Sequence, residues 1–160
     1  MDAALLRRVE QQRVEMLYGN ALAVSGSALL MVAMIAIITW PHTPHNRIIA
    51  WGSIALLVQA YMLWLAERYR RARDRETASS AWGWKFAATA MVAGVIWGSA
   101  AFVLVGANQS LTLALIAACL AGRATISVIT NAHFPPALHS FTAPIFGLLA
   151  LRYISLGGYG

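Results

Sequence analysis

The chain has 160 residues, of which 59% are hydrophobic and 11% are charged, and its formal net charge is +6 at pH 7. A soluble domain carries about 25% charged residues, and a core of this size would not hide so much apolar surface from water. Composition therefore excludes an ordinary soluble domain and favours a protein folded in the lipid bilayer. The basic residues stand at the ends of apolar segments, which argues against nucleic-acid binding.

Residues 1–18 are predicted to form a cytoplasmic amphipathic helix. Its apolar residues recur near helical spacing, and charged side chains fill much of the remainder. These apolar residues are Leu5, Leu6, Val9, Met16 and Leu17. We expect the helix to lie on the inner membrane face or to continue into the first span. It would serve as an orientation anchor, or else as a lever or a dimer contact.

Five apolar segments follow, each of about 20 residues and so long enough to cross roughly 30 Å of hydrocarbon. They are predicted at 21–40, 48–65, 86–105, 111–130 and 138–156. Proline-containing or small polar stretches separate most of them, as in Pro41-His42-Thr43-Pro44. The sequence therefore predicts an all-α fold, a polytopic transmembrane helix bundle of five spans that occupies residues 19–160.

The distribution of basic residues predicts the orientation. Three arginines precede the first segment, and five arginines and Lys85 lie between the second and third segments. Arg47 is the only basic residue in the loops at the other side, 41–47 and 106–110. Cytoplasmic loops carry the excess of Lys and Arg. We therefore expect a multi-pass protein of the bacterial inner membrane with a cytoplasmic N-terminus.

Arg123 is the most informative single residue because it lies well inside the fourth segment. A charge at that depth costs about 2.5–3.5 kcal/mol on insertion scales, so it usually has a partner or a purpose. The nearest acidic candidate is Glu67, at the inner end of the second segment. We expect Arg123 to pair with Glu67, to bind an anionic small or lipid-like ligand, or to snorkel toward the inner headgroups. Arg152, toward the outer side of the fifth segment, would snorkel or face a cavity.

Small residues four apart occur in two of the segments. Gly94 and Gly98 form a G-x-x-x-G step in the third segment, and Gly122 continues a row of small residues in the fourth. Such spacing lets two helix backbones approach closely. The pattern is compatible with packing inside the bundle and with a homodimer seam.

Motifs for catalysis, cofactors and metals are missing. His42 and His45 fall in an outer loop, whereas His133 and His139 fall at the inner side, so the two pairs cannot share a site. Neither loop supplies the three or four ligands that a zinc site needs. No Gly-rich phosphate loop, nucleophile elbow or carboxylate pair is present. The sequence thus predicts no catalytic residue, no cofactor and no metal.

Several short motifs resemble the N-terminal membrane regions of bacterial multi-domain signalling proteins. They are Leu17-Tyr18-Gly19-Asn20, Trp40-Pro41, Gly94-x-x-Trp97-Gly98, Gly122, and Phe134-Pro135 followed by Pro144. In that family such regions precede diguanylate cyclase (GGDEF), phosphodiesterase (EAL) or histidine-kinase output domains. The family pattern has six spans and then a cytoplasmic catalytic domain. The resemblance therefore implies a chain that stops before its sixth span and its output domain.

The function implied by this resemblance is a membrane-embedded sensing and anchoring module that works as a homodimer. Any enzymatic activity would belong to the output domain of the parent protein, so no catalytic residue carries over to this chain. The alternative is a complete small multi-span membrane protein such as a transporter subunit. A membrane-embedded enzyme is disfavoured because paired acidic or histidine residues inside the spans are missing.

Overall fold

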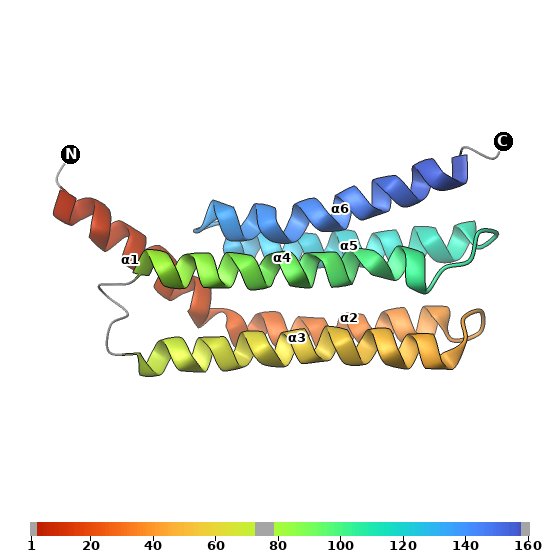
Figure 1. Ribbon diagram of the computed structural model, residues 1–160, viewed down its shortest axis with the longest axis horizontal. Coiled ribbons are helices and arrows are strands. Elements are labelled where there is room, and N and C mark those ends of the chain that lie inside the picture. Colours follow the sequence, from red (N-terminus) through yellow and green to blue (C-terminus); the bar gives the residue numbers. More distant parts are fainter. Residues whose placement is uncertain (1–2, 73–78, 158–160) are drawn as a thin grey trace.

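The computed structural model describes residues 3–72 and 79–157, and every regular element in these ranges is a helix. The helices are α1 (Ala3–Gly19), α2 (Ala21–Thr39), α3 (His45–Arg71), α4 (Ser79–Val103), α5 (Ser110–Asn131) and α6 (Pro135–Gly157). Helices α2 to α6 lie roughly along one common axis, and their connections lie at the two ends of the molecule (Figure 1). The N-terminus and the C-terminus lie at opposite ends (Figure 1).

The outside of this bundle is apolar. Six large aliphatic side chains on four helices are between 69% and 74% exposed: Leu30, Ile37, Leu57, Leu111, Ile129 and Ile154. Buried positions are instead rich in alanine and hold polar residues such as Gln59, Arg123 and Asn131. A protein in water would reverse this distribution, so the surface of the bundle suits a hydrocarbon solvent.

Four helices are long and apolar enough to cross a membrane, namely α3, α4, α5 and α6. The segments Gln11–Gly19 and Ala23–Thr39 meet the same criterion only together, as a pair bent by 43°. The described residues thus hold four candidate spans, or five if the bent pair is one span. The prediction of an all-helical fold is confirmed for the described residues, and the four long apolar helices are consistent with a membrane protein. The exact number of five spans stays a prediction.

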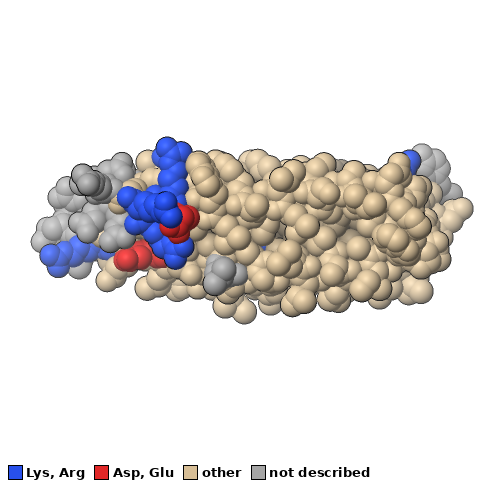
Figure 2. Space-filling model, turned by 90° about the horizontal axis from the view of Figure 1, so that it is seen from below, with Lys and Arg blue, Asp and Glu red and all other residues tan. Residues whose placement is uncertain are grey.

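Helices α3 and α4 are longer than the apolar segments that predict them. Helix α3 continues from Leu65 to Arg71, and α4 begins at Ser79 rather than near Phe86. The added turns carry charged and aromatic side chains. Because such residues lower the mean hydropathy, a prediction from hydropathy alone ends the span before them. Charged residues gather at this end, where the N-terminus also lies, and are scarce over the rest of the face in Figure 2.

Helix α1 is present, but the predicted apolar stripe along it is only partly buried. Leu17 is fully buried together with Val14, whereas Val9 and Met16 are 37% and 49% exposed. The side chains of Leu5 and Leu6 lie outside the described part. Only the last turns of α1 reach the bundle, because the helix leaves it at an angle (Figure 1). The amphipathic character predicted for this helix is therefore not confirmed.

The two loops at the opposite end of the molecule are joined by hydrogen bonds. The Thr43 hydroxyl donates to the Leu104 carbonyl at 2.5 Å, and Gln109 Nε2 donates to the His42 carbonyl at 3.2 Å. The connection between α2 and α3 is thereby tied to the connection between α4 and α5. These bonds satisfy the backbone carbonyls of Leu104 and His42.

Helix α4 packs most closely against α6. A methyl group built on Gly94 would overlap the carbonyl oxygen of Phe141, and one on Gly98 would lie 2.9 Å from Leu148 Cδ1. Gly122 faces α2, since a methyl group there would lie 3.3 Å from Met31 Cε. All three glycines therefore face helices of the same chain. Gly94 and Gly98 are buried under α6, which fits packing inside the bundle rather than a homodimer seam.

The α4–α6 seam predicts the effect of one added methyl group. Gly94→Ala should lower the free energy of unfolding by about 1–3 kcal/mol, because the backbones must separate to admit the side chain. Gly147→Ala is the matched control: Gly147 is also helical, but nothing lies within 4 Å of its added methyl group. Unfolding of both variants in detergent micelles measures the difference. Equal stability of the two would contradict the close seam.

Candidate functional site

Arg123 is buried between two aromatic rings. It stands on the inward face of α5 and is 2% exposed. The guanidinium carbon lies 5.5 Å from the ring centre of Trp97 on α4 and 5.3 Å from that of Phe141 on α6. A flat, weakly hydrated guanidinium is well suited to such faces, and each cation–π contact contributes about 0.5–2 kcal/mol. The rings thus offset part of the cost of burying the charge.

Hydrogen-bond partners of Arg123 are few. Its Nη1 donates to the Ser27 hydroxyl on α2 at 3.4 Å, which is long for a hydrogen bond. Its Nε is buried and has no protein partner. Within residues 3–72 and 79–157, the ion pairs are formed by Glu67 with Arg70 and Arg71, and none involves Arg123. The positive charge of Arg123 is therefore not neutralised by a carboxylate in the described structure.

A second unpaired polar atom lies on the same helix. Asn131 is 6% exposed and donates through Nδ2 to the Ser127 hydroxyl at 2.8 Å, while its Oδ1 has no protein partner. Arg123, Ser127, Thr130 and Asn131 line one small cavity of about 10 Å³. Apolar side chains from four other helices complete its wall: Val24, Met62, Phe86, Ala90 and Phe141. We call this space the Arg123 cavity.

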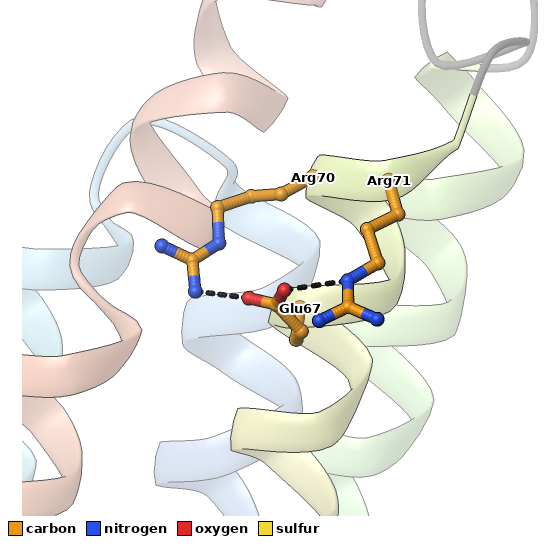
Figure 3. A network of polar contacts seen from close by, with 3 residues as sticks. All are labelled: Glu67, Arg70 and Arg71. Atoms are coloured by element: carbon orange, nitrogen blue, oxygen red, sulfur yellow. Dashed lines mark hydrogen bonds and ion pairs between the residues drawn. The ribbon is translucent and has the colours of Figure 1, made fainter.

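The described structure does not contain the predicted pair between Arg123 and Glu67. Glu67 binds Arg70 and Arg71 on its own helix, with Arg71 Nε at 2.7 Å from the carboxylate (Figure 3). Residues three and four positions apart on a helix are neighbours, so this contact forms locally. The same carboxylate would have to leave the charged end of α3 to reach a buried group on α5. The Arg123 side chain is almost fully buried, which argues against snorkelling toward the headgroups.

Arg152 lies at the far end of the bundle from this cavity. Its Nη2 donates to the Val105 carbonyl at 2.8 Å, and its guanidinium lies 5.5 Å from the ring centre of Phe102. Arg152 thus ties the last helix to the end of α4, where free carbonyls and the helix dipole favour a cation. Arg123, Glu67 and Arg152 thus lie apart from one another, and Arg123 lines the cavity.

Sequence reasoning missed an aromatic joint at the charged end, which consists of Tyr18, Tyr69, Trp82 and Phe86. The rings of Tyr18 and Tyr69 stack at 4.2 Å, and the Tyr18 hydroxyl donates to the Trp82 carbonyl at 2.9 Å. Phe86 meets Tyr18 edge to face at 5.4 Å. These contacts hold the last turn of α1 against the end of α3 and the start of α4. The clustering of Tyr and Trp near predicted span ends was a signal, but it indicated only interfacial anchors.

The histidines do not form a metal site in the structure. Among the described residues, no three His, Cys, Asp or Glu side chains lie close enough together to hold a metal ion. His45 instead stacks on Trp40, with ring centres 4.1 Å apart.

Comparison with known proteins finds no relative: no family model matches the chain, and neither a curated protein nor a solved structure is significantly similar. The function must therefore be argued from the Arg123 cavity and the aromatic joint. The resemblance to bacterial sensor regions stays a prediction.

The hydrogen bond in the aromatic joint predicts how much the Tyr18 hydroxyl contributes to stability. Tyr18→Phe should lower the free energy of unfolding by about 0.5–1.5 kcal/mol, because the Trp82 carbonyl loses a buried donor. Tyr61→Phe is the control, since Tyr61 is 50% exposed and should change stability by less than about 0.5 kcal/mol. Denaturation of both variants in micelles gives the comparison. If Tyr18→Phe lowered the free energy of unfolding no more than Tyr61→Phe does, the Tyr18 hydroxyl would not hold α1 in place.

Proposed function

We propose that this chain is the membrane-embedded sensing and anchoring module of a bacterial signalling protein. The observation that carries the proposal is the Arg123 cavity, to which all five helices from α2 to α6 contribute side chains. Whatever neutralises the buried charge interacts with the packing of the whole bundle. An intramembrane cation of this kind is by default a functional site.

The proposed mechanism is a shift between two packings of the bundle. A ligand that binds better to one packing raises the population of that packing. The Arg123 cavity lies in the half of the bundle that also holds the aromatic joint, since Phe86 belongs to both. A change in how α3 and α4 pack around the cavity would therefore reach Tyr18 and alter the angle of α1. Helix α1 is then the element that passes the signal on.

The proposal includes a multi-pass arrangement in the inner membrane with a cytoplasmic N-terminus. The last turn of α3 carries Arg68, Arg70 and Arg71, whereas Arg47 and Arg152 lie toward the opposite end. Cytoplasmic segments carry an excess of Lys and Arg, so this asymmetry favours a cytoplasmic location for the arginine-rich end. Homodimer formation also belongs to the proposal, because the resembling signalling enzymes work as dimers.

Cysteine labelling tests this orientation. In a Cys119→Ala background, Asn108→Cys should react with a membrane-impermeant maleimide on intact spheroplasts. Arg71→Cys should react only after permeabilisation, because it would face the cytoplasm. Both native side chains are exposed, so burial does not confound the comparison. The reverse pattern would overturn the orientation, and labelling of both sites from outside would overturn the membrane-spanning arrangement.

The sensing role predicts a movement of α1 that depends on the Arg123 cavity. Spin labels at Arg13 on α1 and Arg71 on α3, both exposed in the native chain, report the distance between these helices in nanodiscs. Arg123→Met removes the charge and should shift the distance distribution, because one packing loses its stabilising interaction. Arg152→Met is the control and should leave the distribution unchanged. An identical distribution in all three proteins would overturn the sensing role.

The second candidate function is a transporter subunit. Ionisable residues inside spans also mark ion pathways, and Arg123 is one. Ion flux through proteoliposomes that is lost in Arg123→Met, with no movement of α1, would favour this candidate.

The coding sequence after the Gly160 codon gives a further test of the proposed sensor. An open frame with another span and an output domain would support the sensor.

A further inference from the structure

We propose that a pocket between α1 and α3 binds the headgroup of a zwitterionic phospholipid with a primary amine, phosphatidylethanolamine. The pocket has a volume of about 340 Å³, within the range of roughly 300–1,000 Å³ that is typical of small-molecule sites. Residues of α1 and α3 form most of its wall, among them Glu15, Tyr18, Leu63, Ala66, Tyr69 and Arg70. We call it the α1–α3 pocket. The proposal rests on the membrane-embedded arrangement of the bundle but not on its role as a sensor.

Two opposite charges line the α1–α3 pocket without pairing with each other. Within the described residues, the ion pairs are those of Glu67, and the carboxylate of Glu15 takes part in none. Arg70 donates through Nη2 to Glu67, and its side chain extends away from the axis of α3 (Figure 3). A guanidinium carries several N–H donors, so Arg70 can bind a ligand and keep its bond to Glu67. The pocket therefore offers a free carboxylate on one helix and a hydrogen-bond donor with positive charge on the other.

These charges select a ligand that carries both signs. A phosphate accepts hydrogen bonds from Arg70, and a primary ammonium donates to Glu15, so both contacts are hydrogen bonds between charged groups. An anionic lipid without an amine would bring its phosphate toward the carboxylate and leave Glu15 without a cation. A choline headgroup carries positive charge but no N–H donor, and it would leave the carboxylate without a hydrogen bond. Phosphatidylethanolamine has both the phosphate and the primary ammonium.

The wall of the pocket changes from apolar to charged along α3. Leu63, Ala66 and Arg70 are spaced three and four positions apart, so they lie on one face of the helix. The helix rises about 10 Å from Leu63 to Arg70. The headgroup layer on each side of a bilayer is roughly 5–8 Å thick, so this rise covers it and reaches the hydrocarbon. The order of residues thus fits a lipid whose headgroup lies at the charged end and whose acyl chains follow α3 toward the middle of the bundle.

Two stacked tyrosines give the pocket a fixed inner wall. Tyr18 and Tyr69 are each 4% exposed, and their rings stack at 4.2 Å. The hydroxyl of Tyr18 is held by the Trp82 carbonyl at 2.9 Å. The pocket is therefore present without rearrangement of the aromatic joint. A lipid bound there would contact α1 and α3 at the same time.

The test is a lipid titration of the full chain in a mild detergent, with bound lipid counted by native mass spectrometry. The probes are phosphatidylethanolamine, phosphatidylcholine and phosphatidylglycerol with identical acyl chains. One molecule of phosphatidylethanolamine should bind per chain, at least about tenfold more tightly than either other lipid, because only its ammonium donates to Glu15. Phosphoethanolamine, the soluble headgroup without acyl chains, should not displace the lipid at an equal concentration.

Three substitutions separate the two charged contacts. Glu15→Gln should abolish the preference over phosphatidylcholine, and Glu15 is exposed, so the fold should tolerate this change. Arg70→Gln should weaken phosphatidylethanolamine and phosphatidylcholine by a similar factor, since both lipids carry the phosphate. Arg71→Gln is the matched control: Arg71 also binds Glu67 but lies on α3 outside the pocket, so this variant should bind lipid as the native protein does.

Several results would overturn the lipid site. Equal binding of phosphatidylethanolamine and phosphatidylcholine to the native protein would do so, as would an unchanged preference in Glu15→Gln. Displacement by phosphoethanolamine would replace the lipid with a soluble zwitterion. A preference for phosphatidylethanolamine together with an unchanged α1–α3 distance in Arg123→Met would support the lipid site and overturn the sensing role. A shifted distance in Arg123→Met without this lipid preference would do the reverse.

Discussion

The buried charge of Arg123 is the constraint on which the arrangement of this bundle depends. A bilayer provides no water to solvate a guanidinium, so the chain must surround it with its own groups. The structure does this with aromatic faces from α4 and α6, a hydroxyl from α2 and a polar strip on α5. Each helix of the bundle is thereby in contact with the same small region.

The close seam between α4 and α6 makes this environment possible. Gly94 and Gly98 lack side chains, and α6 therefore approaches until the Phe141 carbonyl lies where a methyl group would be. The rings of Phe141 and Trp97, on these two helices, both lie within 5.5 Å of the guanidinium carbon. Small residues thus have a role beyond close packing, because they fix the spacing of the rings that hold a charge. At the charged end, Tyr18 links this unit to α1.

Several parts of the fold and the candidate site follow from the sequence, and others do not. Hydropathy located the apolar segments, and the depth of Arg123 within one of them indicated a functional position. The predicted partner Glu67 was chosen because it is near a span end, but in the structure it binds Arg70 and Arg71 on its own helix. Asn131, Ser27 and Phe141 were not found, since nothing in the local sequence shows which residues of other helices surround a given side chain.

Composition and segment length by themselves determined that this chain is an all-helical protein suited to a bilayer, because about 20 apolar residues in succession have few other stable environments. The distribution of Lys and Arg along the sequence also determined which end of the bundle carries most of the positive charge. Only the tertiary structure decided that Arg123 has no carboxylate, lies between Trp97 and Phe141, and faces a cavity for one small particle. Those properties depend on how five helices meet, and helix contacts far apart in the chain are set by side-chain shape rather than by local pattern.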